Sequence, residues 1–127
     1  MAAQGDKNIQ EEIENKIIDL IALGAGGRLI AFKPENSDKD LIVEKKGDYK
    51  KKAICLNIYQ EKEIQQLAEK KELKAKDDFY LVFVNFDFVK QDIDDNFWLV
   101  PSSDFQKKLL TNKKDFVRFL IESFEKK

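Results

Sequence analysis

The sequence predicts one α/β (α+β) domain, in which a five-stranded mixed sheet is flanked by helices. The hydrophobic patterns follow the order helix, three strands, helix, two strands and two helices (α-β-β-β-α-β-β-α-α). The segment 79–88 is nearly continuous in apolar and aromatic residues, as expected of a central strand that is covered on both faces. The chain has 127 residues without repeats, low-complexity segments or linkers, which favours a single domain over 1–127.

The first half of the chain predicts a helix followed by three strands. Residues 8–23 carry Ile and Leu at helical spacing, which is typical of an amphipathic helix that packs on one side. Glycines cluster directly after this segment and indicate that the helix ends there. Strands are expected at 28–33, 40–46 and 51–59, with the last two paired as an antiparallel hairpin.

The second half of the chain predicts a crossover to the central strand. Residues 61–73 have apolar side chains on one side only, which predicts a surface helix between the hairpin and the strand at 79–88. An acidic loop at 90–96 separates this strand from a last strand at 97–101, which Pro101 is expected to stop.

Two helices are expected after this last strand. Ser102 or Ser103 can cap a short helix that runs through Leu110. Asn112 and Asp115 are then expected to open a final helix, which carries Phe and Leu residues along one face.

The composition excludes several classes of chemistry. The chain has 23 Lys and Arg against 24 Asp and Glu, and this net charge of -1 removes the global electrostatic argument for nucleic acid. It has no His and one Cys, which excludes Ser-His and Cys-His pairs, His-containing zinc sites and an intrachain disulfide. No apolar run approaches the roughly 20 residues of a spanning helix, and the first ten residues lack a signal-peptide pattern. We therefore expect a cytoplasmic protein without a membrane partner.

Three strings and the order of elements resemble the PD-(D/E)xK, or restriction endonuclease-like, superfamily. The strings are DLIVEKKG, which Asp40 opens after a polar loop, FYLVFVNFDF and FWLVPSSDF. The resemblance covers roughly residues 9–110. It implies that Asp40 lies at the start of the second strand, where the family places a metal-binding Asp. The family also has Glu or Asp, any residue, then Lys on the third strand, and together these residues hold a divalent metal.

The third strand departs from this family pattern at the catalytic pair. When the triplet is placed on Asn57, Ile58 and Tyr59, an amide replaces the acid and a phenol replaces the Lys. Placing it on Cys55, Leu56 and Asn57 also supplies neither carboxylate nor ammonium. Phosphodiester hydrolysis with Mg²⁺ needs hard oxygen ligands and a Lys near the attacking water, so the expected catalytic role is lost.

A rearranged active site is the alternative. Glu14 on the first helix could point toward Asp40, and Glu44 and Lys46 share a strand face with Asp40 by two-residue alternation. Glu44 lies about 13 Å along the strand from Asp40, however, too far to share one ion. The simpler interpretation makes Asp40 a strand-entry cap, with Glu44 and Lys46 as solvated hairpin charges.

The tip of the hairpin carries a local excess of positive charge. Five lysines and one tyrosine could grip phosphates and stack on bases, or the lysines could protect an exposed hairpin against edge pairing. These residues are Lys45, Lys46, Tyr49, Lys50, Lys51 and Lys52. The acidic loop 90–96 begins like a calcium loop but lacks the Gly and Glu that an EF-hand requires.

The leading hypothesis is a catalytically inactive binding or assembly module with a restriction endonuclease-like fold and no cofactor. Its partner would be nucleic acid, another protein or a second copy of the chain. The alternative is a Mg²⁺-dependent nuclease with a rearranged site, for which Asp40 is the metal ligand and Asn57, Tyr59 and Glu14 are the other candidates. A third hypothesis is an interaction protein with an unrelated α/β fold.

Overall fold

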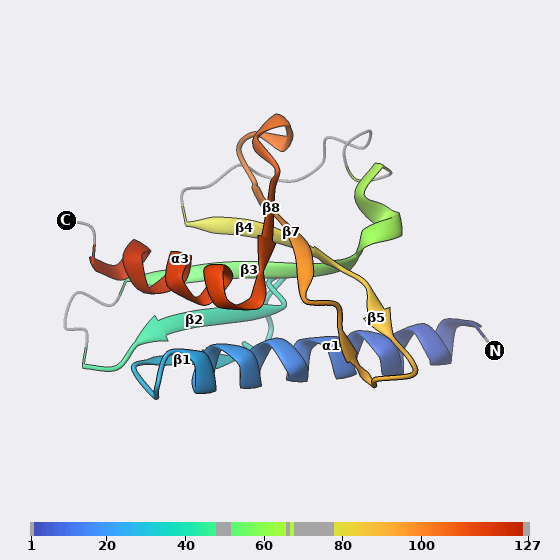
Figure 1. Ribbon diagram of the computed structural model, residues 1–127, viewed down its shortest axis with the longest axis horizontal. Coiled ribbons are helices and arrows are strands. Elements are labelled where there is room, and N and C mark those ends of the chain that lie inside the picture. Colours follow the sequence, from blue (N-terminus) through green and yellow to red (C-terminus); the bar gives the residue numbers. More distant parts are fainter. Residues whose placement is uncertain (1, 48–51, 66, 68–77, 126–127) are drawn as a thin grey trace.

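The computed structural model has a mixed sheet with helices packed on it (Figure 1). It describes residues 2–47, 52–65, 67 and 78–125, and the side chains of the first helix from residue 9 onward. In chain order the elements are α1 (Ala2–Gly24), β1 (Leu29–Phe32), β2 (Leu41–Lys45), β3 (Ala53–Gln60), η1 (Glu61–Glu63), β4 (Phe79–Val84), β5 (Phe86–Asp87), β6 (Asp92–Ile93), β7 (Asn96–Pro101), η2 (Phe105–Lys107), β8 (Leu109–Asn112) and α3 (Lys113–Glu125), where η marks a 3₁₀ helix.

The main sheet of the described residues has six strands in the order β1-β2-β3-β4-β7-β8. The β3–β4 pair is parallel, and every other neighbouring pair is antiparallel. The expected antiparallel hairpin is therefore confirmed as β2 and β3. The strand expected at the centre is also confirmed, because β4 lies between β3 and β7.

The second half of the chain differs from the expected order in two places. The segment 79–88 is not one strand, because β4 ends at Val84 and β5 begins a separate two-stranded hairpin with β6. That hairpin includes part of the loop expected at 90–96. The resulting main sheet has six strands instead of the expected five.

The short helix expected from Ser102 or Ser103 through Leu110 is wrong. Asp104 caps a single 3₁₀ turn, η2, by accepting a hydrogen bond from the Gln106 N–H at 2.9 Å. The following residues form β8, because pairing with β7 satisfies their backbone groups. The final helix does begin at Asn112 as expected, since its side chain accepts a hydrogen bond from the Asp115 N–H at 2.8 Å.

Two hydrophobic clusters cover the two faces of the sheet. On one face, α1 and α3 pack on the strands, and fully buried residues such as Ile17, Leu56 and Phe116 lie between them. On the other face, Phe83 and its neighbours on β4 pack with side chains from β3 and β7. Ile64 and Leu67, after η1, and Phe105 in η2 complete this cluster. The sheet core therefore lies between two layers, as the apolar character of β4 predicts.

Glycines end the first helix, as the sequence predicts. Gly26 and Gly27 have positive φ angles of 59° and 79°, a conformation that glycine adopts without strain, and they end α1 as expected.

The helix expected at 61–73 is described only at its start, where η1 leads into helical residues 64, 65 and 67. Its remainder lies outside the described residues. No helix in the described ranges is long and apolar enough to cross a membrane.

Candidate functional site

Asp40 and Asn57 face each other at the start of β2. Leu41 pairs with Leu56 in the antiparallel ladder, so Asp40 stands opposite Asn57 one position further along. The Asp40 N–H donates to Asn57 Oδ1 at 2.8 Å, and the Ile58 N–H donates to Asp40 Oδ2 at 2.7 Å. These two bonds join the polar loop before β2 to the middle of β3.

Asn57 uses both ends of its side-chain amide in this contact. While Oδ1 accepts from Asp40, Nδ2 donates to the Asp38 carbonyl oxygen at 3.3 Å. The side chain is buried, with 8% of the residue exposed, so these partners are not replaced by water. A carboxylate at position 57 could not donate to the Asp38 carbonyl. The two hydrogen bonds at position 57 therefore require an amide.

The first helix adds a second carboxylate and two further polar groups. Gln10 Nε2 donates to Glu14 Oε2 and to the Ile58 carbonyl oxygen, both at 2.9 Å, which ties α1 to β3. Lys33, just after β1, places its Nζ 3.7 Å from Glu14 Oε1. Glu14 thus points toward this end of the sheet, as expected. The sequence analysis missed Gln10 and Lys33; the four-residue spacing of Gln10 and Glu14 on one helix face was the available signal for Gln10.

Asp40 has an unusual acidity for a carboxyl group. Its pKa is raised from 3.8 to about 6, mainly because burial penalises the charged form. The Ile58 N–H opposes this by stabilising the carboxylate, while the negative charge of Glu14 raises the pKa further. Two carboxylates therefore influence each other here, and a bound cation would relieve their repulsion.

Tyr59, which the sequence resemblance aligns with a Lys, packs against a hydrophobic cluster of the core. Its ring stacks on Phe83, with ring centroids 5.4 Å apart and an interplanar angle of 24°. Burial raises its pKa above 10.0, against a hydrogen bond with Asn57 that lowers it, so the phenol stays neutral near pH 7. Cys55, the start of the other triplet placement, is half-buried in the same hydrophobic cluster. Neither residue supplies a positive charge.

The remaining residues of the rearranged site do not join Asp40. Glu44 pairs with Ala53 in the ladder, at the opposite end of β2 from Asp40, and Lys46 follows the end of that strand. Within the described ranges, no three His, Cys, Asp or Glu side chains are grouped as metal ligands. Glu14 is the carboxylate whose charge acts on Asp40, while the charges of Asp38 and Glu63 help to raise the pKa of Tyr59.

The lysine hairpin is described only at its two ends. Lys45 and Lys46 are exposed, whereas Tyr49, Lys50 and Lys51 lie outside the described residues. Lys52 Nζ donates to the Ser123 carbonyl oxygen at 2.6 Å and lies 6.0 Å from the centre of the Phe124 ring. The positive charge of Lys52 thus lies at the C-terminal end of α3, where the helix dipole favours a cation.

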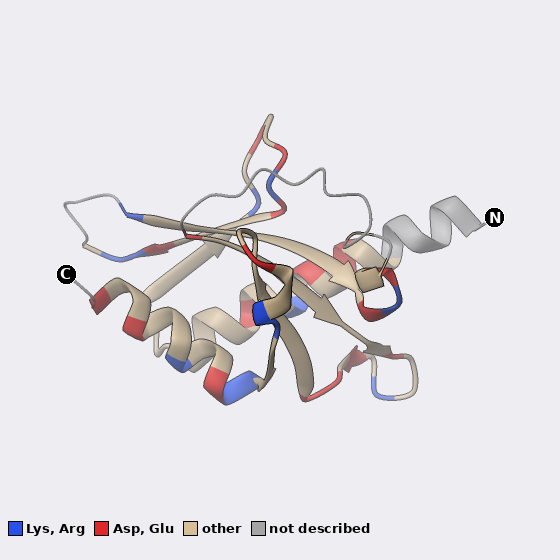
Figure 2. Ribbon diagram, turned by 90° about the horizontal axis from the view of Figure 1, so that it is seen from above, with Lys and Arg blue, Asp and Glu red and all other residues tan. Residues whose placement is uncertain are grey.

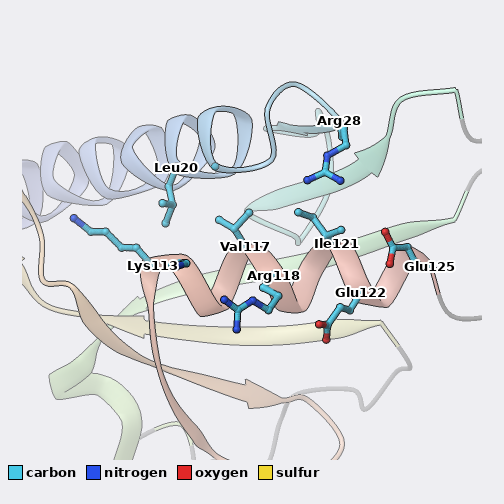
Figure 3. A pocket seen from close by; sticks show the side chains of 10 residues that line it. Leu20, Arg28, Lys113, Val117, Arg118, Ile121, Glu122 and Glu125 are labelled. Carbon is cyan, nitrogen blue, oxygen red and sulfur yellow. The ribbon is translucent and has the colours of Figure 1, made fainter.

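Charge on the rest of the described surface is mixed. Lys and Arg alternate with Asp and Glu around the described elements (Figure 2). A groove of about 620 Å³ between α1 and α3 has a floor that includes Leu20, Val117 and Ile121. Arg28 and Glu125 lie at one end of this groove (Figure 3). Because cations and carboxylates share the lining, the groove favours no single class of charged ligand.

Comparisons of the chain with family models, curated proteins and solved structures found no match.

Proposed function

We propose that the chain is a catalytically inactive binding or assembly module with a restriction endonuclease-like fold. The antiparallel β2–β3 hairpin, the parallel β3–β4 pair and the packing of α1 against β1 and β3 support this scaffold. Asp40 lies at the start of β2, opposite the triplet that begins at Asn57. In this proposal, positions that serve hydrolysis in the nuclease family hold the fold together instead.

The Asp40–Asn57 contact carries this proposal. One oxygen of Asp40 accepts from a backbone N–H, and both ends of the Asn57 amide bond to the loop before β2. Metal-dependent hydrolysis needs carboxylate oxygens that are available to the ion and a cationic group near the attacking water. Asn57 and Tyr59 supply neither, and Tyr59 is stacked on Phe83. The two side chains therefore favour a structural role.

A Mg²⁺-dependent nuclease with a rearranged site is the second candidate. The charge of Glu14 raises the pKa of Asp40, and the Lys33 ammonium lies 3.7 Å from Glu14. Two acids and a lysine are the groups that such chemistry uses. Against this candidate, Glu14 is already bonded to Gln10 and paired with Lys33.

A cleavage assay separates the two candidates. Purified protein is incubated with single- and double-stranded DNA and RNA in Mg²⁺ or Mn²⁺, beside the variants Asp40→Ala and Asp94→Ala. Asp94 is the matched control, because it is an exposed acid outside the site. We expect no cleavage by any of the three proteins. Cleavage that persists in Asp94→Ala and disappears in Asp40→Ala would establish the nuclease and overturn the inactive module.

A further inference from the structure

The outer edge of β8 has main-chain groups that no strand of the described sheet pairs with. β8 is the last strand in the sheet order, with β7 on its inner side. The Lys113 N–H donates to the Asp95 carbonyl oxygen at 3.1 Å. Because hydrogen-bonded and non-hydrogen-bonded residue pairs alternate along an antiparallel ladder, this bond shows which residues of β8 bond to β7. Leu109 and Thr111 therefore bond to β7, whereas the N–H and C=O of Leu110 point toward the outer edge.

The side chains of this edge are apolar and accessible. Leu109 and Leu110 are 55% and 56% exposed, although both belong to a strand. Leu110 stands opposite Trp98 in the ladder, so these two side chains share a sheet face. Exposed edges in natural sheets usually carry a charge or a proline within the strand, and β8 has neither.

Lysines lie on both sides of these leucines. The sequence around β8 reads KKLLTNKK, with Lys107 and Lys108 before the leucines and Lys113 and Lys114 after the strand. Lys113 Nζ already pairs with Asp92 Oδ2 at 3.0 Å, so the exposed lysines that a partner can meet are Lys107, Lys108 and Lys114. If two copies paired antiparallel through this edge, the lysines before the strand would approach those after it. Like charges placed opposite each other disfavour such pairing. The edge is thus protected against its own copy but remains open to a strand of opposite charge.

We infer that the outer edge of β8 binds an extended acidic segment of a partner protein, which adds a strand to the sheet. Main-chain hydrogen bonds at Leu110 would align this segment, and acidic residues on both sides of its centre would meet the lysines. This inference rests on the proposed function, because it names the partner of an assembly module. A nucleic acid could also meet the lysines, but it offers neither a backbone ladder nor apolar side chains for the leucines.

Peptide binding tests this inference directly. The full chain is titrated with acetyl-Glu-Glu-Val-Thr-Val-Glu-Glu-amide and with the matched peptide in which Lys replaces each Glu. The fluorescence of Trp98, the single Trp of the chain, reports binding, since Trp98 stands opposite Leu110. We expect the acidic peptide to bind at least about tenfold tighter than the Lys peptide. This preference should shrink as salt rises from about 0.1 M to about 1 M, because charges are then screened within about 3 Å.

Two variants locate the binding to the edge. Leu110→Pro removes an outward N–H without removing a bond to β7. It should therefore lower the affinity for the acidic peptide at least about tenfold. Leu110→Thr should weaken its binding less, because it removes apolar contact, keeps the N–H and adds no charge. Leu23→Thr is the matched control, since Leu23 is exposed on α1, and its affinity should equal the wild type. Circular dichroism and thermal unfolding verify that each variant is folded.

Several results would overturn the inference. They are no binding of the acidic peptide up to about 1 mM, equal binding of the Lys peptide, unchanged affinity in folded Leu110→Pro, and tighter binding of a DNA or RNA oligonucleotide. If Leu110→Pro does not fold, unchanged affinity in Leu110→Thr overturns it instead. Failure of peptide binding leaves the absence of cleavage untouched, whereas Asp40-dependent cleavage defeats the proposed function whatever the peptide does.

Discussion

Asn57 shows how one buried amide can join a loop to a strand with both its oxygen and its nitrogen paired. The amide accepts from Asp40 and donates to Asp38, which a carboxylate cannot do. In Asn57→Asp, an acceptor would face the Asp38 carbonyl and a second charge would approach Asp40. We expect this change to lower the free energy of unfolding by about 1–3 kcal/mol.

Chemical denaturation at pH 7 measures the effect of Asn57→Asp. The matched control is Asn15→Asp, the same change at an exposed position of α1, which should stay within about 0.5 kcal/mol of the wild type. Equal stability of the two variants would mean that the amide of Asn57 is not needed for the contact.

Asp40 gives the site a dependence on pH. Its folded pKa of about 6 exceeds the ordinary value of 3.8, so between these two pH values the folded state holds more protons than the unfolded state. The free energy of unfolding contributed by Asp40 therefore decreases as pH rises through this window. In Asp40→Asn, the free energy of unfolding should therefore not show the decrease that Asp40 causes in the wild type as pH rises. Solvent screening moderates its size, because Asp40 is only partly buried.

Carboxyl NMR titration checks this acidity at the residue itself. We expect an Asp40 pKa of about 6 in the wild type and a lower value in Glu14→Gln, where the nearby negative charge is removed. A wild-type pKa close to 3.8 would show that burial does not penalise the charged form. An unchanged pKa in Glu14→Gln would show that the two carboxylates do not interact.

At the scale of elements, Lys52 connects the hairpin to α3. Its Nζ donates to the carbonyl oxygen of Ser123, which lies in the last turn of the described helix. From the sequence, replacing the hairpin lysines is expected to leave stability almost unchanged, because exposed charges contribute little. The structure changes this expectation for Lys52. We predict that Lys52→Gln lowers the free energy of unfolding by about 1 kcal/mol.

Lys46→Gln is the control for Lys52→Gln, since Lys46 is an exposed lysine on the other strand of the hairpin. Thermal or chemical unfolding should show almost no change for this variant. Equal losses in the two variants would contradict a specific role for the contact with α3.

The sequence predicted elements with strong local patterns and missed those that depend on pairing. α1, β2, β3 and β4 have clear periodicity or long apolar runs, and they form near the expected positions. β8 has four residues between lysines, and the nearby serines resemble a helix cap. Its extended conformation depends on pairing with the preceding strand β7, and its own four residues carry no strand pattern that would reveal this pairing.

At the scale of the whole molecule, the candidate site brings together three segments that lie far apart in the sequence. The approach of Asn57 to Asp40 follows from the register of the hairpin; the sequence predicted the two antiparallel strands but not this residue pairing. The contribution of α1 depends on how the helix packs across the sheet, so Gln10 and Lys33 could not be placed from residue spacing alone. The site is thus a junction of α1, the loop before β2, and β3.

This junction links the fold to the proposed function. Its hydrogen bonds engage the side chains of Asp40 and Asn57, which a metal-dependent nuclease would need to direct toward an ion. The same bonds stabilise the sheet, in which β8 is an edge strand. We therefore expect Asp40 and its neighbours to hold the structure together and not to bind a divalent cation.

A crystal structure of the protein soaked in Mn²⁺ tests this claim most directly, because anomalous scattering locates the ion. We predict no Mn²⁺ near Asp40 and Glu14, with the Asp40–Asn57 hydrogen bond intact. A Mn²⁺ ion bound at about 2.0–2.6 Å from carboxylate oxygens of Asp40 and Glu14 would contradict the account.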